Sequence, residues 1–108
     1  MAGPKTTTEA RRWAREAIEN GRFVPSVHFG RRLAERRVTM NDVEAIFSRR
    51  GRVEPYPAVG ENGGTCWRFF GLNIDGDAEI AVGIEAFHDG DGEERIILCT
   101  VLPPKEKS

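Results

Sequence analysis

The hydrophobic pattern of this chain changes its period at Gly51, and this change constrains the fold more than any other feature. Before Gly51, apolar residues recur every three or four positions, which is the spacing of one buried helical face. After Gly51, apolar and polar residues alternate, as they do in strands with one buried face. Helices and strands in separate blocks predict an α+β fold rather than an alternating α/β fold.

The first half of the chain predicts three helices. Ser26 and Thr39 are expected to cap the second and third helices, with Asp42 at the capping-box position of the third. Between the first two helices, residues 23–25 are expected to be a connector, because Pro25 disfavours helix at the residue before it. The first helix is expected at about 8–20, with a buried face of Ala10, Trp13, Ala14, Ala17 and Ile18.

The second half predicts four strands joined by glycine-rich turns, at 52–56, 65–74, 79–87 and 95–102. Pro55 and Pro57 are expected to stop the first strand and to place it at a sheet edge. In the second strand Arg68 has the same parity as Phe70, and we expect this side to be the one that the helices cover. The predicted fold is therefore three N-terminal helices packed on one face of a roughly four-stranded antiparallel sheet.

Length and composition predict one globular domain over residues 1–108, with loose ends at 1–6 and 103–108. No run approaches the roughly 18 apolar residues that span a bilayer, so no membrane association is expected. The first residues lack the apolar segment of a signal peptide, and a cytoplasmic location is expected. Cys66 and Cys99 have neither a metal-binding nor a redox spacing, so reduced thiols are expected.

The charge is unevenly divided between the two halves of the chain. Residues 1–52 carry 12 Lys and Arg against 6 Asp and Glu, whereas residues 53–108 carry 4 against 11, which leaves a net charge of −1. The basic half could form a binding face, or the oppositely charged halves could simply pack beside each other. A pI near 6.1 argues against tight non-specific binding of nucleic acid, which depends on neutralising phosphates.

One constellation suggests chemistry. His28, Arg32 and Arg36 follow one another at intervals of four residues, so on a helix they form one strip at the border of the apolar side. An imidazole can move a proton near neutral pH, and guanidiniums bind phosphate. In the structural alternative, His28 packs at the helix start while the arginines are solvated or pair with Glu35 or the acidic half.

Arg68 is the second candidate, because a half-buried arginine in a strand needs a partner. That partner could be an internal carboxylate such as Glu85 or the phosphate of a ligand. The segment 88–94 is acidic but lacks the frame of a calcium loop, and the histidines and cysteines have no local zinc spacing. We therefore expect no metal and no cofactor. The sequence also lacks phosphate-binding glycine loops and a serine or cysteine nucleophile motif.

The pattern H-x3-R-x3-R, followed by T-x-x-D-V-x-x-I and then E-x-Y-P, resembles domain of unknown function 4258. The residues that carry the resemblance are His28, Arg32, Arg36, Thr39, Asp42, Val43, Ile46, Glu54, Tyr56 and Pro57. A later strand that begins near Trp67 and Arg68 and a closing strand with Thr100 also fit. The resemblance covers about residues 24–102, and the first helix is additional.

This family is similar in fold to small toxins of the RelE and BrnT type, so the resemblance implies a RelE-like α+β fold. It also implies a toxin-like, RNA-binding protein or a metal-independent ribonuclease, in which a ribose 2′-hydroxyl attacks the adjacent phosphate. RNA and a cognate antitoxin-like protein are the partners that follow. Toxins of this type are usually basic, however, and this chain is slightly acidic. The alternative is a non-catalytic protein-interaction module of the same fold.

The resemblance also implies roles for individual residues. His28 would be the general acid or base, and Arg32 and Arg68 would stabilise the phosphate in the transition state. Arg36, Tyr56 and Thr100 would contact and position the substrate.

Overall fold

A computed structural model describes residues 3–49, 51–76 and 78–106. Within these residues the chain has an α+β fold, with three helices and one five-stranded mixed sheet. The helices are α1 (Thr7–Glu19), α2 (Val27–Arg36) and α3 (Met40–Ser48). The strands are β1 (Phe23–Pro25), β2 (Val53–Val59), β3 (Thr65–Leu72), β4 (Ala78–His88) and β5 (Glu94–Glu106).

Local side-chain caps begin all three helices. The hydroxyls of Thr6, Ser26 and Thr39 each accept a backbone N–H in the first turn, which satisfies a donor that the helix cannot pair itself. The capping box predicted at Thr39 and Asp42 is confirmed. The second carboxylate oxygen of Asp42 accepts the N–H of Ile74 at 2.9 Å. This bond ties the start of α3 to the turn between β3 and β4.

The sheet has the order β1-β5-β4-β3-β2, and β1 is parallel to β5 while the other pairs are antiparallel. The prediction of four antiparallel strands therefore missed β1, and the interpretation of residues 23–25 as a connector was wrong. Pro25 excludes a helix but is compatible with extended backbone at a sheet edge. Three residues are also too few to show an alternating pattern.

Strand β2 lies at the other edge, as expected, but the prolines do not stop it. It continues through Pro55 and Pro57 to Val59, paired on one side only, with β3. A proline lacks a backbone N–H, and an edge strand tolerates that loss on its unpaired side. The chain turns back in the loop 60–64, which is shorter than expected.

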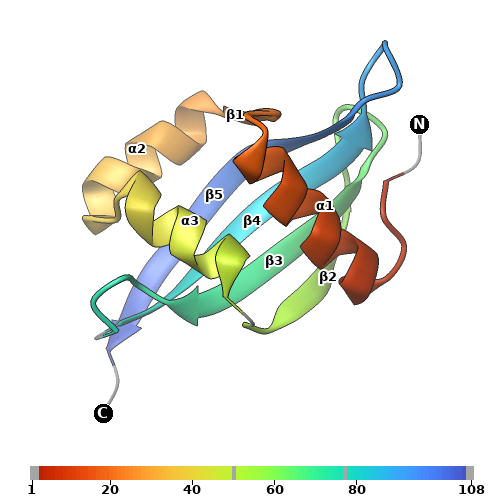
Figure 1. Cartoon of the computed structure of the whole chain (residues 1–108). Helices are drawn as coiled ribbons and strands as arrows, with labels where there is room; N and C mark the ends of the chain where they lie inside the picture. Colours follow the sequence, from red (N-terminus) through yellow and green to blue (C-terminus); the bar gives the residue numbers. More distant parts are fainter. Residues whose placement is uncertain (1–2, 50, 77, 107–108) are drawn as a thin grey trace.

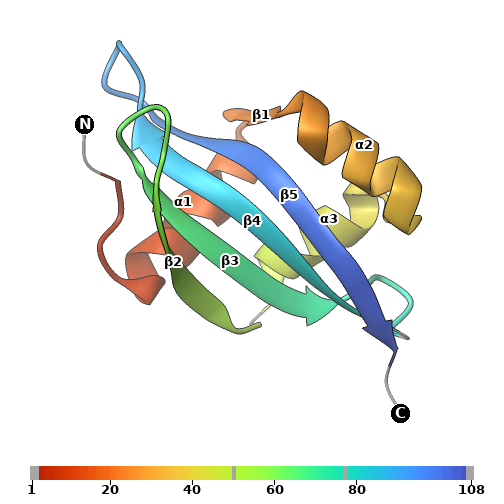
Figure 2. The same ribbon diagram turned by 180° about the vertical axis from the view of Figure 1, so that it is seen from behind.

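Figure 1 shows α1 and α3 in front of the sheet, with α2 further out, alongside β5. No helix of the described residues lies on the opposite face (Figure 2). We call this second surface the open face. The core lies between the helices and the covered face, and β4 contributes the predicted set of Ile80, Val82, Ile84 and Ala86.

The face of β3 was assigned wrongly from the sequence. Trp67 and Phe69 are buried under the helices, with 4% and 2% of their surface exposed, and Phe69 packs edge-on against Phe47 of α3. Arg68 therefore lies on the open face. Apolar residues occupy both parities of this strand, so alternation alone could not decide which side would be covered.

The ends of the chain are less loose than expected. Gly3 and Pro4 are buried, and the hydroxyl of Thr65 donates a hydrogen bond to the carbonyl of Pro4 at 2.8 Å. Strand β5 continues to Glu106, past the expected end at 102. Residues 1–2 and 107–108 of the expected loose ends lie outside the described residues.

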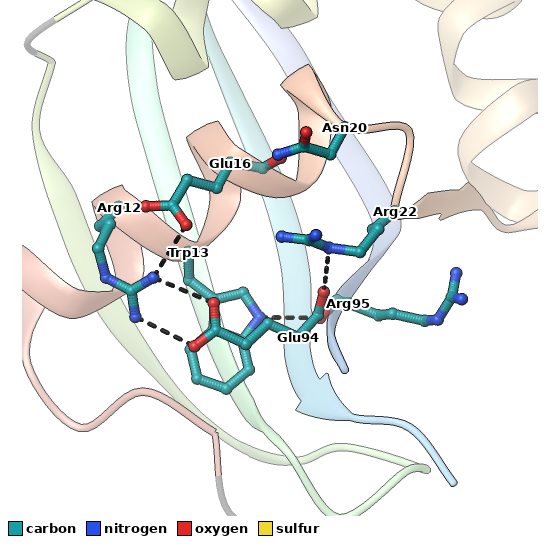
Figure 3. A network of polar contacts seen from close by, with 7 residues as sticks. All are labelled: Arg12, Trp13, Glu16, Asn20, Arg22, Glu94 and Arg95. Atoms are coloured by element: carbon teal, nitrogen blue, oxygen red, sulfur yellow. Dashed lines mark hydrogen bonds and ion pairs between the residues drawn. The ribbon is translucent and has the colours of Figure 1, made fainter. Parts of the chain in front are cut away.

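A polar network joins α1 to the start of β5 (Figure 3). The guanidinium of Arg12 donates two hydrogen bonds to the carboxylate of Glu94, at 3.0 and 3.1 Å. The indole N–H of Trp13 donates to the carbonyl of Arg95, and Arg22 donates to that of Glu94. Here the basic first half and the acidic second half of the chain pack against each other, as one interpretation of the charge pattern expected.

No helix among the described residues has the length and apolar character needed to cross a membrane.

The pair between Arg12 and Glu94 predicts a pH-dependent part of the stability. The hydrogen bond from Arg12 holds the pKa of Glu94 below its ordinary value of 4.5. The stabilisation is present above that ordinary value and is lost as pH falls through the lower pKa of the folded state. Because the pair is partly exposed, we expect about 0.5–1 kcal/mol. Urea unfolding of the wild type and of Glu94→Gln near neutral pH and near pH 3 measures it.

The free energy of unfolding should fall less between the two pH values in Glu94→Gln than in the wild type. Glu93→Gln, which removes an exposed carboxylate from the same hairpin, is the matched control and should behave as the wild type does. Equal losses in all three proteins would contradict this role of the pair.

Candidate functional site

A cavity of about 450 Å³ lies at the open face, between the start of α2 and the loop 60–64. Its floor comes from β3, β4 and β5, and β2 contributes one wall. We call it the open-face pocket. Four of the six predicted site residues line it: His28, Tyr56, Arg68 and Thr100. They come from four different elements, so the fold brings them together.

The centre of the floor is hollow because a glycine stands there. In the strand register Arg68 lies opposite Gly83, and Gly83 lies opposite Thr100. A methyl group added to Gly83 would come within 3.0 Å of the Thr100 side chain. Gly83 thus leaves room between a cation and a hydroxyl. The sequence offered a signal for this position, since an isolated glycine inside a strand often marks a close approach.

The guanidinium of Arg68 is held by an aromatic ring rather than by a carboxylate. Its central carbon lies 4.2 Å from the centroid of the Tyr56 ring, a cation–π contact. The Arg68 side chain makes no hydrogen bond or ion pair with any residue that the structure describes. Its N–H donors are therefore available to an anion in the pocket.

Glu85, the internal partner considered for Arg68, is engaged elsewhere. Its buried carboxylate accepts the backbone N–H groups of Asn62 and Gly64, at 3.0 and 2.9 Å, and the Asn62 side-chain amide at 3.1 Å. A methyl group on Gly60 would overlap this carboxylate, at 2.1 Å. Glu85 thus holds the loop 60–64 at the wall of the pocket.

His28 lies at the rim of the pocket, in the first turn of α2. The start of α2 is fixed to β5, because Ser26 donates its N–H to the carbonyl of Leu98 at 3.0 Å and its hydroxyl to that of Cys99 at 3.2 Å. The His28 ring is exposed, and its Nε2 accepts a hydrogen bond from Nε of Arg32 at 3.3 Å.

Arg32 and Arg36 do not line the pocket. Arg32 donates a hydrogen bond to His28 and forms an ion pair with Glu35, so it helps to orient the imidazole. Arg36 donates its Nε to the carbonyl of Val101 at 2.9 Å and so ties α2 to β5. The helical spacing correctly placed the three residues on one strip, but only its first member faces the pocket.

Two thiols that the sequence did not assign to the site also line the pocket. Cys66 and Cys99 are both free and half-buried. Burial, with Cys66 and Glu85 close by, raises the pKa of the Cys99 thiol to about 11. Burial and Glu85 also raise the pKa of Cys66. Both groups are therefore protonated near neutral pH, and they serve as an apolar floor rather than as nucleophiles.

Among the residues that the structure describes, no three or more His, Cys, Asp or Glu side chains form a group that could hold a metal ion. The pocket instead combines an unpaired guanidinium, an exposed imidazole and the hydroxyls of Tyr56 and Thr100. This set can bind an anion and move a proton beside it.

No protein-family model, no curated protein and no solved structure matches this chain. The function is therefore argued from the pocket itself.

The contacts of Glu85 predict a measurable structural role. Glu85→Ala leaves the N–H groups of Asn62 and Gly64 without their acceptor, so the free energy of unfolding should fall by about 2–3 kcal/mol. Glu85→Gln keeps one acceptor oxygen and should lose less. Urea unfolding measures both, and Glu79→Gln, on the exposed part of the same strand, is the control. A loss in Glu85→Ala no larger than that in the control would show that the loop does not depend on this carboxylate.

Proposed function

We propose that the open-face pocket binds a phosphodiester of single-stranded RNA and cleaves it without a metal ion. The observation that carries the proposal is that His28 and Arg68, from an edge helix and a central strand, line one cavity of about 450 Å³. A proton-transfer group and a free guanidinium are the minimum that transesterification of RNA requires. Tyr56 and Thr100 add hydroxyls that can position the ribose or the phosphate.

In the reaction, the 2′-oxygen attacks the adjacent phosphorus and the bond from phosphorus to the 5′-oxygen breaks. His28 Nε2 takes the proton of the 2′-hydroxyl, and water at the open mouth of the pocket supplies a proton to the leaving 5′-oxygen. Arg68 neutralises the charge that develops on the phosphate oxygens. To accept that proton, Nε2 must exchange its contact with Arg32 for one with the substrate hydroxyl.

Other groups in the pocket are poor candidates for the general base. The carboxylate of Glu85 already accepts three hydrogen bonds, and it is buried. The thiols of Cys66 and Cys99 have raised pKa values and stay protonated. His28 is exposed at the rim of the pocket, and an imidazole is the side chain that most often serves as a general base. The assignment of the base to His28 rests on this comparison.

The same proposal includes the family. We infer that the chain belongs to the domain of unknown function 4258 family, has a RelE-like fold and acts in the cytoplasm beside an antitoxin-like partner. The support is the order of elements that carry the motif: His28 on α2, the capping box of Thr39 and Asp42 on α3, then Glu54 and Tyr56 on β2.

A second candidate is the non-catalytic module that binds an antitoxin-like protein. Two exposed valines favour it: Val59, which lines the pocket and is 94% exposed, and Val27, which lies between the lining residues Ser26 and His28 and is 77% exposed. Exposed apolar side chains at a pocket rim are compatible with a protein contact surface.

The cleavage test uses purified protein and a labelled RNA of mixed sequence in EDTA. His28→Ala and Arg68→Met should each lower the rate by about 10²-fold or more, because each removes a group that acts in the transition state. The products should carry a 2′,3′-cyclic phosphate and a 5′-hydroxyl. Arg15→Met, an exposed arginine of α1 on the covered side, is the matched control and should keep the wild-type rate.

RNA with 2′-O-methyl groups throughout should stay intact, since it has no nucleophile. Intact natural RNA with the wild-type protein would overturn the cleavage proposal and favour the second candidate. Equal rates in the wild type and in His28→Ala would overturn the role given to the imidazole.

A further inference from the structure

A second cavity, of about 370 Å³, lies at the opposite end of the β2–β3 pair. Arg49, Arg52, Phe70 and Leu72 are among its lining residues. Ile46 of α3 also lines this cavity, which therefore lies at the edge of the sheet. Strand β2 begins beside it and ends beside the open-face pocket. Nothing in the proposed cleavage uses the second cavity.

The stretch of β2 and β3 between the cavities contains two cation–π pairs. At its far end the guanidinium of Arg52 lies over the ring of Phe70, with its central carbon 4.1 Å from the ring centroid. At the pocket, Arg68 lies over Tyr56 in the same way, at 4.2 Å. The backbone bond from Phe70 N–H to the Arg52 carbonyl places this first pair directly across β2 and β3.

The two pairs lie on the same side of the sheet. Cys66, which is opposite Tyr56, and Phe70 are four residues apart on β3, and even steps along a strand keep to one face. This step of four residues separates the Tyr56–Cys66 row from the Arg52–Phe70 row by about 13 Å. A ligand that contacts both pairs must therefore be extended and longer than a dinucleotide.

Alternating guanidiniums and aromatic rings on a sheet suit single-stranded nucleic acid. Bases stack on aromatic rings and on guanidinium planes, while the arginine charge meets the phosphates between them. The side chain of Arg52 is 59% exposed, so the outer face of its guanidinium is open to a base. Arg49, Arg52 and Arg68 provide the positive charge along the stretch.

We infer that Arg52 and Phe70 form a second subsite, which holds a base and a phosphate of the RNA strand whose scissile phosphate lies in the open-face pocket. This inference rests on the proposed function and names its substrate as a single strand longer than a dinucleotide. The subsite adds affinity and takes no part in the chemistry.

Glu54 opposes the binding of a phosphate at this subsite. It lies on β2 opposite Arg68, and its carboxylate forms an ion pair of 3.0 Å with Nε of Arg52. A phosphate that reaches Arg52 must replace this carboxylate, and the carboxylate then stands beside the strand as a like charge. Removing the charge of Glu54 should therefore raise the affinity for a long ligand.

The test measures binding by fluorescence anisotropy in the His28→Ala protein, with labelled 2′-O-methyl hexauridylate and diuridylate as probes. Phe70→Leu and Arg52→Met should each weaken hexauridylate binding about tenfold, because Arg52→Met removes the plane on which the base stacks and Phe70→Leu removes the ring that holds that plane in place. Diuridylate binding should not change, since that probe fills only the open-face pocket. Phe70→Leu keeps most of the apolar volume, and thermal unfolding verifies that the variant is folded.

Three further variants complete the test. Glu54→Gln should strengthen hexauridylate binding several-fold, whereas Glu44→Gln, an exposed carboxylate of α3 on the covered side, should leave it unchanged. Arg15→Met is the matched control for Arg52→Met.

Unchanged hexauridylate affinity in folded Phe70→Leu and Arg52→Met would overturn the subsite. If Arg68→Met still weakened both probes, the proposed function would stand without it. If neither probe bound the protein and RNA stayed intact in the cleavage assay, both the subsite and the proposed function would fall.

Discussion

Burial of Trp67 and Phe69 beneath the helices is the constraint on which the arrangement of this protein depends. Each ring removes a large apolar surface from water, worth about 2–3 kcal/mol. A slip of one residue in the register of β3 would expose both rings. It would also point the Arg68 side chain into the core, where its charge would have no partner. The packing of the covered face therefore determines the polar character of the open face, and the candidate site is a consequence of the core.

The pocket can bind an anion because some of its polar side chains already have hydrogen-bond partners and others do not. Glu85 is buried and holds the loop 60–64 through three hydrogen bonds, so its charge is used for structure. Among the described residues the Arg68 guanidinium has no polar partner and lies over the ring of Tyr56, so its donors stay available. Ser26 links α2 to β5 and so brings His28 to the same hollow. A fold that paired Arg68 with Glu85 would have left no anion site.

The sequence predicted those features that depend on neighbouring residues. Local chemistry determines the caps at Ser26 and Thr39 and the turns that precede β4 and β5. The α+β class follows from the change of period at Gly51. Strand β1 and the face of Arg68 depend on distant partners, and a local pattern carries no information about them. The same holds for Arg32 and Arg36, since helical spacing groups them with His28 but does not say what they face. The roles of His28 and Arg68 in RNA cleavage, and the family, stay predictions.

Amide chemical shifts can show whether the open face is the ligand surface. Titration of the ¹⁵N-labelled wild type with 2′-O-methyl hexauridylate should move the resonances of Arg68, Gly83 and Thr100, which lie across the pocket floor. The resonances of Ala14 and Arg15 in α1, on the covered side, should stay in place. Saturable shifts confined to the open face would support ligand binding there, whereas shifts confined to the helices, or none at all, would rule it out.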